Sequence, residues 1–152
     1  MISLRSVDQS NWEDCIQLKP KQEQQKFIAS NLYSIAEFQF LPGLIMRAIY
    51  CDEILIGFSM YGLDSDDGNY WIYRFMIDER FQGRGYGKAA MQLIIHDIES
   101  KDDRTDVIML GYKTDNEFAR KLYSQLGFEE MGIASWGEML AKYNFVRNSK
   151  RA

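Results

Sequence analysis

Residues 80–88 read RFQGRGYGK, between a stretch at 70–78 that is typical of a strand and a helical pattern that begins near Tyr86. Three glycines stand at alternate positions of this segment: Gly83, Gly85 and Gly87. The first N–H groups of a helix have no intrahelical partner, and glycine lets them approach an anion with no Cβ in the way. With the cations Arg84 and Lys88 beside it, the segment predicts a cradle for phosphate or pyrophosphate.

Two familiar phosphate-binding motifs do not fit this segment. A dinucleotide fingerprint that starts at Gly83 requires glycine at position 88, which holds Lys88. A P-loop that ends at Gly87 and Lys88 requires glycine at 82 and Ser or Thr at 89, where the chain has Gln82 and Ala89. A tight turn without a ligand and a nucleotide-binding loop of another kind remain as alternatives.

The composition describes one folded domain. The chain has 152 residues, of which 46% are hydrophobic and 26% charged. No apolar run has the roughly 20 residues of a membrane span, and the first residues do not resemble a signal peptide, so we expect a cytoplasmic protein. We expect the domain to occupy residues 1–146, followed by a basic, flexible tail at 147–152.

Charge favours some partners over others. The tail holds three of the 18 basic residues and none of the 22 acidic ones, so residues 1–146 carry 15 basic and 22 acidic groups, a balance of −7. An acidic surface disfavours nucleic acid and mildly favours a cationic partner. A solubilising surface charge is the simpler alternative.

Metal and thiol chemistry are not indicated. The chain has two cysteines and one histidine, His96, in no ligand pattern. We assign no chemistry to His96, and Cys51 has no base in view that would make it a nucleophile. The acidic stretch with Asp64, Asp66 and Asp67 fails the spacing of a calcium loop, and we interpret it as a polar turn.

The remaining patterns predict an α/β domain around one mixed sheet. The predicted strands are 2–7, two in a hairpin at 43–63, 70–78, 106–112 and two within 129–143. The predicted helices are 11–18, 23–40, 86–100 and 116–128, the last ending at Gly127.

The two glycine-bounded motifs resemble a known family. QGRGYG at 82–87 matches the Q/R-x-x-G-x-G/A signature of GNAT-type N-acetyltransferases, and NEFARKLYSQLGF at 116–128 resembles their second signature. The likeness covers the element order of nearly the whole chain. It is closest to bacterial spermine/spermidine (diamine) acetyltransferases, through the segments around 71–87 and 56–63.

The resemblance implies a fold and a co-substrate. The fold is a single domain with a central, mostly antiparallel mixed sheet and a splayed strand pair that forms an acetyl-CoA cleft. The strand before the loop would pair through its backbone with the pantetheine arm, at Phe75, Met76 and Ile77, and an N–H near Met76 would stabilise the oxyanion. The loop would bind the pyrophosphate, through Gln82, Gly83, Arg84, Gly85, Tyr86, Gly87 and Lys88.

The resemblance also implies proton-transfer roles. Tyr123 would protonate the leaving thiolate, and Asn116, seven residues earlier and on the same helix face, would contact the pantetheine arm. The position where relatives carry a catalytic glutamate holds Tyr73, a poor base, which would shape the substrate pocket instead. The base therefore stays unassigned.

The acceptor implied is a small primary amine, first of all a polyamine such as spermine or spermidine, acetylated directly from acetyl-CoA and without a metal. Glu23, Glu37 and Glu138, together with Tyr73, are the candidate substrate residues. An aminoglycoside, an amino acid or a protein N-terminus are alternative acceptors, and a non-catalytic acyl-CoA-binding regulator is an alternative function. Many such folds pair as homodimers through the late strands. The aromatic segment at 133–145 suits that role and suits completion of the core equally, so a homodimer is one possibility and the oligomeric state stays unassigned.

Overall fold

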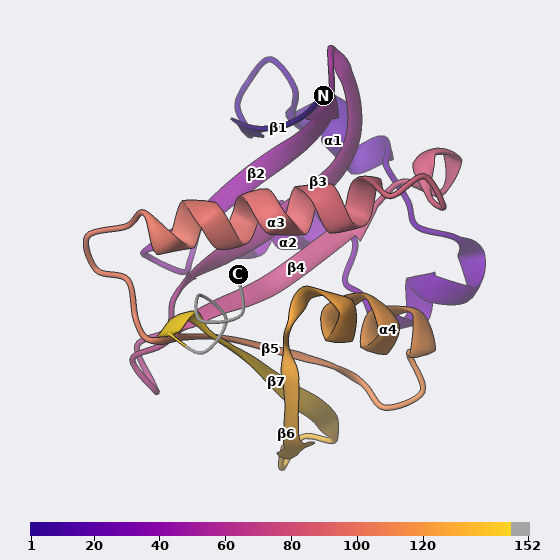
Figure 1. Cartoon of the computed structure of the whole chain (residues 1–152). Coiled ribbons are helices and arrows are strands. Elements are labelled where there is room, and N and C mark those ends of the chain that lie inside the picture. Colours follow the sequence, from indigo (N-terminus) through magenta and orange to yellow (C-terminus); the bar gives the residue numbers. More distant parts are fainter. Residues whose placement is uncertain (147–152) are drawn as a thin grey trace.

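Seven strands pair into one mixed sheet in the computed structural model, which describes residues 1–146 (Figure 1). The sheet order is β1-β2-β3-β4-β5-β7-β6. The strands are β1 (Ile2–Ser6), β2 (Leu44–Cys51), β3 (Ile54–Leu63), β4 (Tyr70–Ile77), β5 (Val107–Lys113), β6 (Glu129–Ile133) and β7 (Glu138–Asn144). The helices are α1 (Trp12–Gln17), α2 (Asn31–Phe38), α3 (Tyr86–Glu99) and α4 (Glu117–Leu126), with 3-10 turns η1 (Gln22–Phe27) and η2 (Glu79–Phe81). The predicted α/β class and mixed sheet are confirmed.

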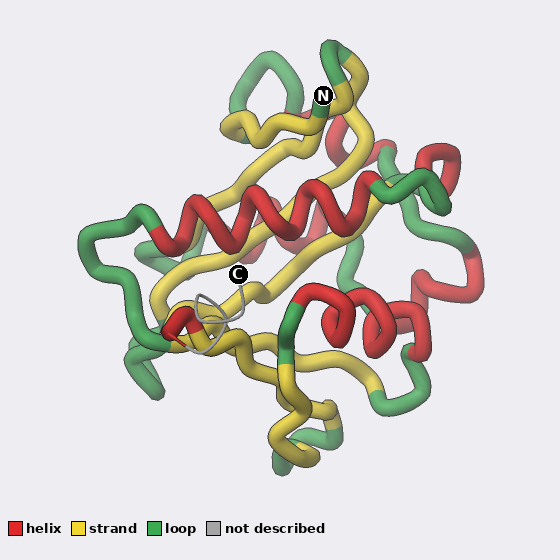
Figure 2. Tube along the Cα trace, viewed as in Figure 1, coloured by secondary structure: helices red, strands yellow, loops and turns green. Residues whose placement is uncertain are grey.

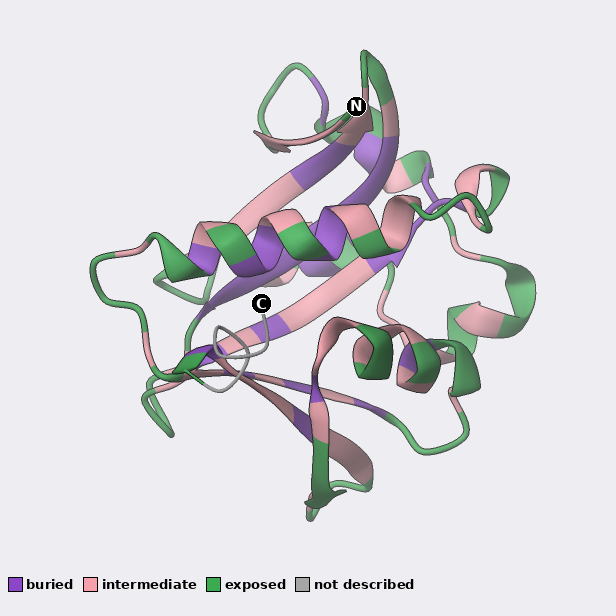
Figure 3. Ribbon diagram, in the orientation of Figure 1, coloured by how far each residue is buried: buried purple, intermediate pink, exposed green. Residues whose placement is uncertain are grey.

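The helices cover both faces of the sheet. In Figure 1, α3 crosses in front of β2–β4, α4 lies in front of β5, and α1 and α2 lie behind. The inner side of α3 is buried and its outer side exposed, as Figure 3 shows. Ala119 and Tyr123 of α4 belong to the core cluster of that front face, whereas Met60 and Met76 belong to a cluster on the α2 face. Two apolar cores therefore flank the sheet, as in other layered α/β domains.

The predicted long helix at 23–40 is wrong, because the chain forms η1 and α2 with a break between them. Ile28 is extended, with φ −140° and ψ 141°. The hydroxyl of Ser30 accepts a hydrogen bond from the N–H of Tyr33 at 3.1 Å, which makes Ser30 the N-cap of α2. A serine cap stabilises a helix start at this point, and the apolar spacing on either side concealed it.

Strands β4 and β5 diverge soon after they meet (Figure 2). Their parallel pairing includes only Tyr70 with Ile108 and Trp71 with Met109. On the other side, β3 pairs with β4 at Ile72 and Arg74 and skips Tyr73. A residue left out of the register in this way is a β-bulge, which bends its strand. The C-terminal half of β4 consequently has a strand partner on one side only within residues 1–146.

Three predictions of the sequence remain predictions. The basic tail at 147–152 lies outside the described residues. Within residues 1–146, no helix combines the length and the apolar character that crossing a bilayer requires. The cytoplasmic location and the homodimer are not tested by the structure.

Candidate active site

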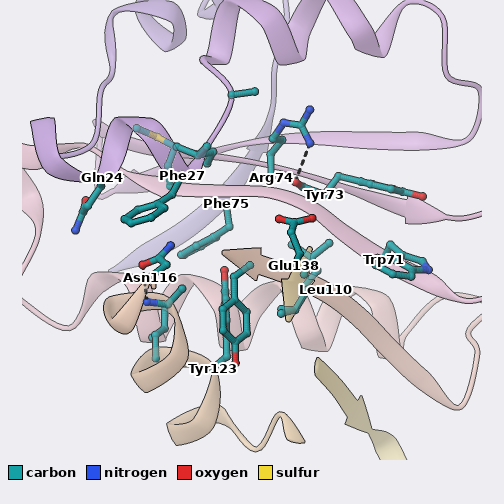
Figure 4. A pocket seen from close by; sticks show the side chains of 18 of the residues that line it. Gln24, Phe27, Trp71, Tyr73, Arg74, Phe75, Leu110, Asn116, Tyr123 and Glu138 are labelled. Atoms are coloured by element: carbon teal, nitrogen blue, oxygen red, sulfur yellow. Dashed lines mark hydrogen bonds between the residues drawn. The ribbon is translucent and has the colours of Figure 1, made fainter. Parts of the chain in front are cut away.

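A cavity of about 650 Å³ opens where β4 and β5 diverge. Its walls come from β4, β5, α4, the segment 24–29, the turn before β4 and the start of β7. Figure 4 shows Gln24, Phe27 and Asn116 towards one end of this cavity and Trp71 towards the other. Phe75, Tyr123 and Glu138 lie between the two ends.

Alternate residues of β4 direct their backbone N–H and C=O groups into the gap between β4 and β5. Phe75, Met76 and Ile77 all line the cavity. The carbonyl of Met76 faces β3, because it lies 2.5 Å from where a Cβ on Gly57 would stand. Backbone groups alternate along a strand, so those of Phe75 and Ile77 face the gap. The carbonyl of Ile77 accepts a hydrogen bond from Gln82 at 2.8 Å. The N–H of Met76 therefore faces β3. An oxyanion donor that faces the gap, as predicted near Met76, would have to be the N–H of Phe75 or of Ile77.

The glycine loop leaves the start of α3 open. Gly83 and Gly85 have φ angles of +80° and +82°, a conformation that disfavours any residue with a Cβ. Gly85 is the N-cap of α3, and no side chain caps the helix. Arg84 and Lys88 are exposed beside this helix start. The loop thus offers uncapped N–H groups and mobile positive charge, which together suit an anion.

Gln82 carries an unpaired acceptor into the cavity wall. Its side-chain nitrogen bridges Gln24 and the Ile77 carbonyl, at 2.8 Å each. Its Oε1 is buried and has no hydrogen-bond partner within the described chain. A buried carbonyl without a donor is costly, so this atom is a point at which a ligand N–H would be favoured.

Helix α4 contributes a phenol to the cavity wall. Asn116 caps the helix by accepting from the N–H of Ala119 at 3.1 Å, and Asn116 and Tyr123 both line the cavity, as their spacing predicts. The Tyr123 ring contacts Tyr112 and Phe128, with centroids 5.8 and 5.7 Å away. Within residues 1–146 its hydroxyl makes no hydrogen bond. Burial raises the pKa of Tyr123, so its hydroxyl carries a proton across the physiological range.

The far end of the cavity is acidic, which the sequence analysis missed. Its lining includes the acidic turn, defined here as Asp64, Asp66 and Asp67. The Tyr73 hydroxyl donates to Asp64 at 2.8 Å, and the Trp71 indole N–H donates to Asp67 at 2.7 Å. Among the described residues, no cation forms a salt bridge with the acidic turn. One feature of the sequence could have indicated this acidic end: the three acids lie just before the aromatic residues Tyr70 and Trp71, which begin the next strand.

Tyr73 connects the acidic turn to the middle of the cavity. Its ring stacks on that of Trp71, with centroids 6.4 Å apart. Burial and the hydrogen bond to Asp64 raise the pKa of Tyr73, so the phenol stays neutral. Its hydroxyl acts as a hydrogen-bond donor to Asp64. This placement agrees with a wall residue and not with a base.

The three predicted substrate glutamates do not come together. Glu138 lines the cavity, but Glu23 and Glu37 do not. Glu23 is exposed on η1. Glu37 is half-buried and pairs with Arg74 at 3.0 Å. Of the predicted set, only Glu138 and Tyr73 reach the cavity. Within residues 1–146 there is also no cluster of His, Cys, Asp or Glu side chains arranged to hold a metal ion.

Comparisons with known proteins agree with this geometry. A family model described as the acetyltransferase (GNAT) family matches residues 4–128. The spermine/spermidine N(1)-acetyltransferase of Bacillus subtilis (strain 168) is 29% identical over 137 residues, which are 86% of this chain and 90% of that protein.

Solved structures show the same fold. An aminoglycoside acetyltransferase in complex with coenzyme A has a TM-score of 0.82 at 15% identity, with both chains fully covered. A ribosomal L7/L12 alpha-N-protein acetyltransferase has a TM-score of 0.77 at 18% identity, over 95% of this chain and 90% of that one.

Proposed function

The chain belongs to the acetyltransferase (GNAT) family, and on this premise we propose that it transfers the acetyl group of acetyl-CoA to a primary amine of a linear polyamine such as spermine or spermidine. The observation that carries the proposal is the cavity itself. A strand edge and a tyrosine lie at its middle, an anion cradle lies beside one end, and uncompensated carboxylates line the other.

The residues present fit acetyl-CoA. The uncapped start of α3, with Arg84 and Lys88, suits the pyrophosphate. The gap-facing amides of Phe75 and Ile77 and the unpaired Oε1 of Gln82 suit the amide groups of a pantetheine arm, which are both donors and acceptors. When bound, acetyl-CoA supplies a thioester whose carbonyl is open to attack by an amine.

The middle of the cavity supplies two elements of acyl transfer. A gap-facing N–H of β4, next to Met76, stabilises the negative charge that develops on the carbonyl oxygen. Tyr123 gives its hydroxyl proton to the departing thiolate. Because a thiol has a pKa of about 8.5, the transfer from a phenol is uphill and requires the two groups to be in contact.

The acidic end supports the choice of acceptor. The acidic turn precedes Tyr70, five residue steps of β4 before Phe75, and its Asp64 carboxylate accepts a hydrogen bond from the Tyr73 hydroxyl. This end of the cavity is suited to a second ammonium group of a long acceptor, rather than to the amine that reacts. The stacked rings of Trp71 and Tyr73 lie along this path and favour cations and alkyl chains. The relative from Bacillus subtilis, whose name gives polyamines as substrates, supports the same class.

Thiol release from acetyl-CoA tests the proposal against a panel of spermine, spermidine, an aminoglycoside, free amino acids and a peptide with a free N-terminus. We expect the polyamines to have the highest kcat/KM. A higher value for the aminoglycoside, an amino acid or the peptide would refute the polyamine assignment. Acetyl-CoA binding without turnover of any amine would instead indicate a regulator.

A further inference from the structure

Glu138 stands at the middle of the cavity, near Phe75 and Tyr123. It begins β7, and Figure 4 shows its carboxylate reaching from β7 towards β4, into the space bordered by Tyr73, Phe75 and Tyr123. Met139, its neighbour, packs on the core cluster of the α4 face, so Glu138 projects to the opposite face of the sheet. Tyr123 and Glu138 therefore approach the gap between β4 and β5 from its two sides.

Gly111 makes room for this approach. A Cβ at Gly111 would stand 3.3 Å from Oε1 of Glu138 and 3.6 Å from its Cβ and Cδ. The Glu138 side chain thus lies across the bare backbone of β5. Any larger residue at position 111 would displace the carboxylate by a few tenths of an ångström.

One oxygen of the carboxylate is held and the other is available. The indole N–H of Trp136 donates to Oε1 at 2.8 Å. Across residues 1–146, Oε2 accepts no hydrogen bond and no cation lies within salt-bridge distance, although Lys113 stands opposite Glu138 in the strand register. Glu37 is different, because Arg74 neutralises it. A carboxylate that is oriented by one hydrogen bond and has no cationic partner is equipped to accept a proton.

We propose that Glu138 is the general base of the acetyl transfer, a proposal that rests on the proposed function. The Glu138 carboxylate removes one proton from the acceptor ammonium. The amine nitrogen then forms a bond to the acetyl carbon, and the bond from that carbon to sulfur breaks. Tyr123 protonates the thiolate, and the second proton lost by the nitrogen restores the Tyr123 hydroxyl. Glu138 releases its proton to solvent, which gives an amide, a thiol and one free proton.

The other titratable groups of the cavity are less suited to this step. Tyr73 is already a donor, to Asp64. Asp64 accepts that hydrogen bond and two more from backbone N–H groups, and Asp67 accepts from the Trp71 indole, so both acids are engaged at the Tyr70 end of β4. His96 is exposed on α3 and does not line the cavity.

The pH profile of Glu138→Gln tests the proposal. With spermidine at neutral pH, we expect kcat/KM to fall about 100-fold or more, as for the loss of a general base. The variant depends on acceptor that is already neutral, so its kcat/KM should rise about tenfold per pH unit between about pH 7 and 9, below the amine pKa near 10.4. The wild-type value should not rise in this way, and acetyl-CoA binding, measured by calorimetry, should be unchanged.

Three further variants complete the test. Glu138→Asp keeps the carboxylate but withdraws it, so it should lose kcat while keeping the wild-type pH profile. Trp136→Phe removes only the indole donor and should cost about tenfold or less. Glu13→Gln, on the exposed side of α1, is the matched control and should change nothing.

A Glu138→Gln enzyme that keeps the wild-type pH profile and changes only the acceptor KM would refute the base role. If the variant fails to fold, the kcat and pH profile of Glu138→Asp decide, and a wild-type kcat there would refute the role. Wild-type enzyme that acetylates no amine would refute the proposed function instead, which separates the two failures.

Discussion

At the scale of single residues, the middle of the cavity separates its groups by protonation state. Burial raises the pKa of Tyr123, and burial with a hydrogen bond to Asp64 raises that of Tyr73, so both phenols are neutral. Glu138 has only the Trp136 indole as a hydrogen-bond donor within the described chain. The acid and the base that we propose thus stand on opposite sides of the gap between β4 and β5.

Replacement of Tyr123 by Phe separates catalysis from binding. The variant keeps the ring contacts with Tyr112 and Phe128 and removes only the hydroxyl, the proposed proton donor. We expect kcat to fall about 100-fold, while the Kd for acetyl-CoA changes by less than about threefold. Steady-state kinetics and calorimetry measure the two quantities. An unchanged kcat would exclude Tyr123 as the acid.

Two glycines of the loop offer a matched pair of substitutions. Gly85→Ala places a Cβ at φ +82° and should lower the free energy of unfolding by about 1 kcal/mol. Gly87→Ala lies inside α3, where a Cβ would meet Ile77 and Phe75 at 3.7 and 4.0 Å, which are ordinary contacts. This second change should be neutral or stabilise by up to about 1 kcal/mol. Urea denaturation compares them, and equal effects would contradict this account of the loop.

At the scale of elements, the end of β4 organises the site. The bulge at Tyr73 bends the strand away from β5, and Asp78 terminates it. The buried carboxylate of Asp78 accepts from the N–H of Lys19 at 3.0 Å and from the N–H and guanidinium of Arg80 at 3.1 and 2.8 Å. These bonds attach the glycine loop and the segment after α1 to the same strand end.

Asp78→Asn should weaken this junction in a pH-dependent way. Burial raises the pKa of Asp78, but the hydrogen bonds outweigh it, so the folded-state pKa lies below the usual value. The stabilisation is therefore complete above the unfolded pKa of about 3.9 and is lost as the pH falls through the folded pKa. We expect a loss of about 1–3 kcal/mol at neutral pH.

In acid, this loss should shrink, because wild-type Asp78 is then neutral as well. Urea titrations of both proteins at neutral and acidic pH measure the difference. A penalty that is independent of pH would show that the charge of Asp78 does not stabilise the fold.

Local signals explain which elements were predictable. The glycine loop and the helix stop at Gly127, with φ +102°, depend on backbone conformations that only a few residues adopt. The bulge at Tyr73 and the contact of Glu138 with Gly111 depend instead on strands far apart in sequence, and no local pattern encodes them. The acidic turn was correctly interpreted as a polar turn, but its place in the cavity was not predictable, because its neighbours there come from the tertiary fold.

At the scale of the whole molecule, the groups to which we assign roles lie on both faces of the sheet. The cradle at α3 and the proton donor on α4 lie on one face, and Glu138 and Tyr73 project to the other. The gap between β4 and β5 connects the two sides, an arrangement that suits the direct acetyl transfer proposed above. The formal charge of −4 and the acidic turn, which has no salt-bridge partner within residues 1–146, favour a substrate with several positive charges.

The most direct test of this account compares spermidine with a monoamine of the same chain length that has a single ammonium group. If the acidic end binds the remote ammonium groups, kcat/KM for spermidine should exceed that for the monoamine by at least about tenfold, which corresponds to about 1.4 kcal/mol of binding. The ratio should fall as salt is added. Equal kcat/KM values for the two amines at low salt would contradict the polyamine assignment.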